Sequence, residues 1–94
     1  MAKLKYRVRV RLGDQELVLL VPAAPETTVG ELQTEVLARA QRQGVIGSAC
    51  AFSVDGALLD ELDSVEDVVE VEQAIDARLT PLQGSGWFMG DLAA

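Results

Sequence analysis

The sequence contains no histidine and only one cysteine among its 94 residues. Without histidine the chain cannot build a Ser-His-Asp or Cys-His catalytic unit, or a metal site based on imidazole ligands. A lone cysteine cannot form a disulfide within the chain or a CxxC zinc knuckle. These absences argue against most enzyme classes, and we expect no catalytic residue, no metal site and no cofactor.

Long apolar runs are also missing. The longest uninterrupted one, Leu17 to Val21, is far too short to cross a membrane, so we expect no membrane partner. The N-terminal residues alternate between charged and apolar types, whereas a signal peptide needs a continuous apolar stretch. Together with the lack of a disulfide, this predicts an intracellular protein, located in the cytoplasm, the cytoskeleton or the nucleus.

Acidic residues outnumber basic ones, 15 to 8, so the net charge is −7. General nucleic-acid binding needs a net positive footprint, and we therefore expect no nucleic-acid partner. The two signs are nevertheless segregated along the chain. Residues 1–12 contain no acid and carry the cations Lys3, Lys5, Arg7, Arg9 and Arg11. Residues 55–76 contain no base and carry the acids Asp55, Asp60, Glu61, Asp63, Glu66, Asp67, Glu70, Glu72 and Asp76.

The N-terminal quarter has the pattern of a β-hairpin. Leu4–Leu12 alternates strictly between apolar and basic residues, which predicts a half-buried strand with its cations on the outer face. Gly13-Asp14 supplies a tight turn, and Glu16–Val21 follows as the partner strand. Because proline cannot donate to a strand ladder, we expect Pro22 and Pro25 to end this second strand.

The remaining sequence predicts one main helix and several short elements. Thr28-Val29-Gly30-Glu31 has the form of a capping box, which opens an amphipathic helix over Val29–Gln43. Gly44 is the residue type expected just past a helix end. The short elements are strands at Ala49–Val54, Ala57–Leu59 and Val71–Leu79, and a helical turn at Asp63–Asp67 capped by Asp63 or Ser64. The glycines and proline of residues 81–94 predict a flexible tail or linker.

The order of these elements resembles that of the ubiquitin-like β-grasp family. The segment Pro25–Leu32 resembles the entry into the ubiquitin helix, Gly44-Val45 resembles its end, and Ser64–Val68 resembles the turn before the last strand. The third strand and the turn after it are matched by Phe52, Val54, Gly56 and Leu59. The resemblance implies an α+β domain over residues 1–80, with a mixed four- to five-stranded sheet packed on one main helix.

Two departures from ubiquitin bear on function. A conjugated modifier of this family ends in Gly-Gly, whereas this chain continues as Leu82-Gln83-Gly84-Ser85-Gly86. Ser53 stands at the position that matches the central isoleucine of the patch gripped by ubiquitin receptors. The resemblance therefore implies a domain that binds partners through other residues. A small modifier or sulfur carrier, processed in the C-terminal tail, is the alternative.

The charge distribution resembles that of the Phox-and-Bem oligomerisation domains. Those domains share the β-grasp, carry basic residues on the first strand and an acidic motif after the third, and associate basic face to acidic face. Of the acidic motif itself only Asp55-Gly56 matches. The resemblance implies head-to-tail self-association, with an acidic counter-surface formed by Asp55, Asp60, Glu61, Asp63, Glu66 and Asp67.

We predict a partner-binding site on the basic strand and its neighbour, formed by Lys3, Lys5, Arg7, Arg9, Arg11, Val18 and Leu20. Cations that recur about every 7 Å along one strand attract acidic segments. Val18 and Leu20 would point outward from an edge strand, where free backbone groups can accept another strand. Two alternatives stay open. Outward acids of the last strand, Glu72 and Asp76, can neutralise the cations, and the tail around Trp87 can cover the apolar pair.

The function predicted from these features is a non-enzymatic protein-protein interaction module. It would act as an N-terminal scaffold or assembly domain and bind a protein partner with an acidic and apolar surface. Cys50 lies among small apolar residues, which is typical of a buried and inert thiol.

Overall fold

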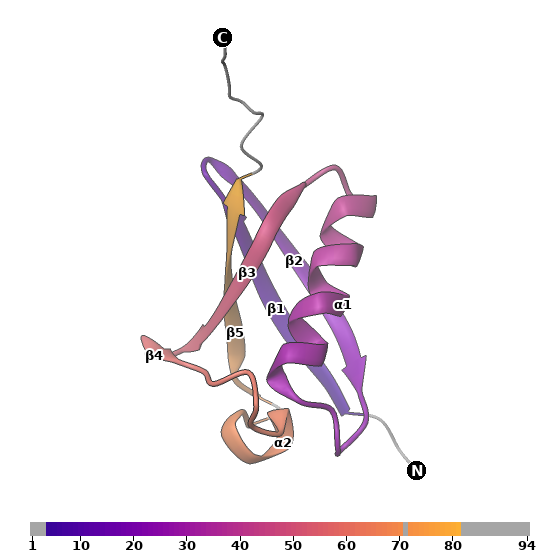
Figure 1. Cartoon of the computed structure of the whole chain (residues 1–94), viewed down its shortest axis with the longest axis vertical. Coiled ribbons are helices and arrows are strands. Elements are labelled where there is room, and N and C mark those ends of the chain that lie inside the picture. Colours follow the sequence, from indigo (N-terminus) through magenta and orange to yellow (C-terminus); the bar gives the residue numbers. More distant parts are fainter. Residues whose placement is uncertain (1–3, 71, 82–94) are drawn as a thin grey trace, which may run out of the picture.

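The computed structural model describes residues 4–70 and 72–81 and has the predicted α+β architecture (Figure 1). Five strands form one sheet in the order β2-β1-β5-β3-β4. Their bounds are β1 Leu4–Leu12, β2 Gln15–Ala23, β3 Gly47–Val54, β4 Ala57–Leu58 and β5 Ala74–Pro81. The main helix α1, Val29–Arg42, packs across one face of the sheet, and the single turn α2, Val65–Val68, lies at one end of the molecule.

The predicted hairpin is confirmed. β1 and β2 pair antiparallel around the two-residue turn Gly13-Asp14, in which Gly13 has a φ of +59°. A glycine at this first turn position accommodates the positive φ of a tight hairpin turn. The expectation that Pro22 ends β2 is wrong, because the strand continues to Ala23. β2 is an edge strand, so a proline there can place its missing N–H on the side without a neighbour.

The predicted capping box of α1 is present. The Thr28 hydroxyl accepts from the Glu31 N–H at 3.1 Å, and the Glu31 carboxylate accepts from the Thr28 N–H at 2.9 Å. Together these two bonds satisfy backbone donors that a helix start otherwise leaves free. The helix ends at Arg42, one residue earlier than predicted, and Gly44 follows with a φ of +88°.

The last strand begins later than predicted. The sequence predicts its start at Val71, which lies outside the described residues, but β5 begins only at Ala74. Glu70 and Gln73 close a turn instead: the Gln73 N–H donates to the Glu70 carbonyl, and the Glu70 N–H donates to the Gln73 side chain.

α2 is capped at Ser64 by position, although the Ser64 hydroxyl makes no capping hydrogen bond.

The core lies between α1 and the inner face of the sheet. The strands contribute the fully buried Tyr6, Val8, Val10, Val21, Phe52 and Ile75, and α1 contributes Val29, Leu32, Val36 and Ala40. In the described part of the chain no helix is long and apolar enough to cross a membrane. The opposite face of the sheet is left without a covering layer among the described elements (Figure 1).

Candidate protein-interaction surface

The uncovered outer face of the sheet carries a row of cations along its central strand. The row, here called the basic ridge, consists of Lys5, Arg7, Arg9 and Arg11 of β1. Alternation along the strand explains this placement, because the apolar residues between these cations enter the core. Lys3, the fifth predicted cation, lies outside the described residues.

Ion pairs divide the basic ridge into two halves. Arg9 Nε lies 3.7 Å from Asp76 Oδ1 on β5, and Arg11 Nε lies 3.1 Å from Glu16 Oε2 on β2. Within residues 4–70 and 72–81, Lys5 and Arg7 form no ion pair. Among the described residues, neutralisation by neighbouring strands therefore applies to the half of the ridge near the hairpin turn. In the other half it leaves Lys5 and Arg7, here called the free cations, without an ion pair.

The ion pair between Asp76 and Arg9 is long and leaves both side chains partly exposed. The Asp76 Oδ1 atom is enclosed and has no hydrogen-bond partner among the described residues, while 43% of the side chain as a whole remains exposed. One carboxylate oxygen is thus shielded from solvent although much of the side chain is not. A half-exposed pair at 3.7 Å is weakly stabilising, about 1 kcal/mol or less.

The predicted apolar pair lies along the basic ridge, with Leu20 opposite the free cation Arg7 and Val18 opposite the ion-paired Arg9. Val18 and Leu20 of β2 are 57% and 59% exposed, and their partners across the ladder are Arg9 and Arg7. Pro22, also exposed, is the partner of Lys5. Residues directly opposite on adjacent strands point to the same face, so apolar and cationic side chains form one mixed surface. We call Lys5, Arg7, Val18, Leu20 and Pro22 the docking patch.

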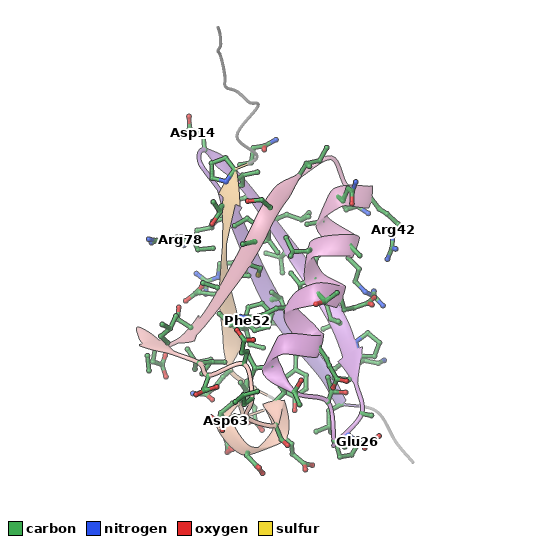
Figure 2. All side chains as sticks on the ribbon, viewed as in Figure 1. Asp14, Glu26, Arg42, Phe52, Asp63 and Arg78 are labelled. Atoms are coloured by element: carbon green, nitrogen blue, oxygen red, sulfur yellow. The ribbon has the colours of Figure 1, made fainter. Side chains whose placement is uncertain are left out.

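Five of the six predicted counter-surface acids lie together at the end of the molecule where α2 meets the start of α1. They are Asp60, Glu61, Asp63, Glu66 and Asp67, all exposed, and are called the acidic end. Backbone bonds fix this loop to the helix, with the Val29 and Gly30 N–H groups donating to the Asp63 and Glu61 carbonyls at 2.8 and 2.9 Å. Figure 2 shows Asp63 at this end.

The sixth predicted acid, Asp55, belongs to a different place in the fold. It lies in the turn between β3 and β4 with a φ of +52°, and it accepts a hydrogen bond from the Gln73 side chain at 3.1 Å. This bond ties the turn to the residue just before β5. Asp55 therefore has a structural role in addition to any in binding.

A hollow of about 400 Å³ on the outer face was not predicted as part of the site. Its lining includes Arg11, Ser53, Leu58, Asp76 and Arg78. Arg78 is the β5 partner of Arg11, and Leu58 is 76% exposed on the short strand β4. Figure 2 shows Arg78 pointing away from α1. Its place beside Arg11 follows from the parallel β1–β5 register, which the sequence pattern does not specify.

The chemistry of the described residues does not favour catalysis at Cys50. Burial raises the pKa of the Cys50 thiol to about 12, so it carries very little thiolate at neutral pH. Burial, assisted by the charge of Glu66, also raises the pKa of Tyr6. In the part of the chain that the structure describes, no group of three or more His, Cys, Asp or Glu side chains is placed so that it could hold a metal ion.

Solved structures similar to this chain include ubiquitin-like domains. One is a structure described as molecular mimicry of SUMO that promotes DNA repair, with a TM-score of 0.56, 19% identity, and coverage of 79% of this chain and 90% of that one. Another is the N-terminal ubiquitin-like domain of the 4931431F19Rik protein, with a TM-score of 0.57, 12% identity and coverage of 87% and 81%. A protein designed computationally on the template of human erythrocytic ubiquitin has a TM-score of 0.51, 26% identity and coverage of 92% and 100%.

These likenesses confirm the predicted fold, and the chain has the ubiquitin-like β-grasp. No protein-family model matches the chain, and no curated protein sequence matches it. The alternative of a modifier or sulfur carrier depends on residues 82–94, and coverage of the apolar pair by the tail depends on the same segment. Both lie outside the described residues.

Proposed function

We propose that this ubiquitin-like domain is a non-enzymatic docking module, acting in scaffolding or assembly, whose docking patch binds an acidic and apolar segment of a partner protein. The observation that carries the proposal is the position of Arg7 and Lys5, two cations without an ion pair among the described residues, beside the exposed Leu20 and Pro22. Domains of this fold are generally non-catalytic modules, which agrees with this role.

The two parts of the patch act differently. Exposed cations attract an acidic segment over several ångströms and orient it on approach. The apolar side chains of Val18 and Leu20 supply the short-range contact, because covering them removes apolar surface from water. A segment in which pairs of acidic residues alternate with pairs of aliphatic residues satisfies both. Because every second residue of an extended segment points to the same side, each side then carries carboxylates that reach the free cations and aliphatic side chains that cover the edge strand.

A synthetic peptide of about eight residues that alternates pairs of Glu with pairs of Val, here called the alternating Glu-Val peptide, tests this proposal. Its affinity is measured by fluorescence anisotropy for the wild type, Arg7→Glu and Arg42→Glu. Arg42 is an exposed cation in the last turn of α1, so its reversal makes the same change in net charge away from the patch. We expect Arg7→Glu to weaken binding at least about tenfold and Arg42→Glu to weaken it much less. Equal losses would show attraction by net charge alone and would contradict a docking patch.

Head-to-tail self-association is a second form of the same function. The basic ridge runs along the outer face of the sheet, whereas the acidic end surrounds α2, so one molecule presents both surfaces at once. Light scattering at low and high salt tests this form, since exposed charge contacts are screened by salt. Growth of the mass with concentration at low salt only would support it. An unchanged monomer under both conditions would remove it.

A further inference from the structure

The free edge of β2 exposes a defined set of backbone groups. In an antiparallel ladder, paired residues alternately do and do not exchange hydrogen bonds. Leu12 and Gln15 close the two-residue turn and so form a hydrogen-bonded pair, as do Val10 with Leu17 and Val8 with Leu19. The N–H and C=O groups of the intervening residues Glu16, Val18 and Leu20 therefore point away from β1. The backbone of Pro22 faces outward in the same way, but proline has no N–H group. The set of outward donors therefore ends at Leu20.

These groups are self-complementary about Val18. Two β2 strands placed antiparallel with Val18 opposite Val18 also place Glu16 opposite Leu20 twice, and each of these pairs exchanges two hydrogen bonds. Every outward N–H and C=O group from Glu16 to Leu20 then has a partner. Pro22 falls just outside the paired segment, so its missing donor costs no hydrogen bond.

We propose that two copies of this chain associate through their β2 edges in this register, forming one continuous sheet across a twofold axis. The contact is isologous, because the same strand segment is used on both sides. It goes beyond the docking function and does not depend on it. Strand addition between identical edges resolves the liability of an edge strand with exposed apolar residues.

Side chains on both faces fit this arrangement. On the inner face, Leu17 and Leu19 are only partly buried in the single chain, and each would lie opposite the partner's other leucine. On the outer face the two Val18 side chains meet at the axis. Across the strands on this face, the neighbouring side chains are, in order, Arg7, Leu20, the partner's Glu16 and the partner's Arg11. A carboxylate therefore lies between two cations across the contact.

Cysteine cross-linking tests the register. In a Cys50→Ala background, Val18→Cys places two thiols on Cα atoms about 5.5 Å apart, within the range of a disulfide. Leu20→Cys is the matched control: its side chain is equally exposed, but the two copies of position 20 lie about 14 Å apart along the strands. We expect mild oxidation to cross-link the first variant and not the second. A mixture of Glu16→Cys and Leu20→Cys chains should form the mixed dimer.

Light scattering of the unmodified protein against concentration is the independent measurement. A mass that rises from monomer to dimer and goes no higher supports the twofold contact. A monomer at all concentrations, or equal cross-linking of the position 18 and position 20 variants, would overturn it. Neither result bears on the docking patch, because peptide affinity is measured separately. A mass that grows past the dimer would instead indicate the open-ended head-to-tail contact and overturn the closed pair.

Discussion

Arg7 on β1 lies directly opposite Leu20 on β2, and both side chains project from the outer face of the sheet. Arg7 has no ion pair among the described residues, and Leu20 is 59% exposed. Arg11, four residues nearer the hairpin turn and on the same face, differs because its Nε lies 3.1 Å from Glu16 Oε2. The proposed docking function depends on this difference between two arginines of one strand.

The first prediction compares these two arginines. Arg7→Ala should weaken binding of the alternating Glu-Val peptide several-fold, because a free cation is removed from the patch. Arg11→Ala should weaken it less, since Glu16 already offsets much of its charge. Titration of both variants at the same ionic strength decides the point. A larger loss from Arg11→Ala would place the site at the hairpin end, around the hollow with Arg78.

The second prediction concerns Asp76. Asp76→Asn releases Arg9 from its ion pair, so the affinity for the acidic peptide should rise. The free energy of unfolding should change by about 1 kcal/mol or less, because the pair is half exposed and Asp76 Oδ1 makes no hydrogen bond to any described residue. Asp67→Asn makes the same charge change at the acidic end and serves as the control. Equal gains in peptide affinity from both variants would mean that binding depends on net charge alone.

The third prediction concerns the close approach of β3 and β5 at Gly47. A Cβ atom added there would lie 2.9 Å from the Leu79 Cβ and 3.0 Å from the Thr80 carbonyl oxygen. Gly47→Ala should therefore destabilise the domain by about 1–3 kcal/mol through overpacking. Urea unfolding measures the change, with the exposed Gln15→Ala as a reference. A stability equal to that of the reference would show that β3 shifts freely.

The fourth prediction concerns pH. Burial raises the pKa of Cys50 to about 12, above the value of about 8.5 for a thiol in an unfolded chain. The folded state then keeps a proton that the unfolded state releases, so the free energy of unfolding should fall as the pH rises from about 9 toward 12. Tyr6, whose pKa is also raised, adds a fall of the same sign. Comparison with Cys50→Ala isolates the thiol, and parallel curves for the two proteins would contradict its burial.

Most of the fold follows from local sequence signals. Strict alternation over Leu4–Leu12 determines which residues face outward, and Thr28 and Glu31 mark the helix start by their own side-chain hydrogen bonds. The start of β5 does not follow, because the turn between Glu70 and Gln73 competes with an apolar pattern that begins earlier. The end of β2 does not follow from the sequence either, because Pro22 is compatible with an edge strand whose outward side has no neighbour.

The candidate surface follows from the sequence only in part. The sequence identifies the cations of β1 and the apolar pair of β2 as outward residues. It does not show which cations are neutralised, because the pairing of Arg9 with Asp76 depends on the register of a parallel strand more than sixty residues away. The separation of Asp55 from the acidic end depends likewise on the turn between β3 and β4.

The most direct test of the docking function is a backbone amide NMR titration of the wild-type domain with the alternating Glu-Val peptide. The account predicts that the largest shift changes fall on Lys5, Arg7, Val18 and Leu20, that they shrink as salt is raised, and that residues of the acidic end stay unchanged. Shift changes centred on α1 or the acidic end, or none at millimolar peptide and low salt, would contradict it.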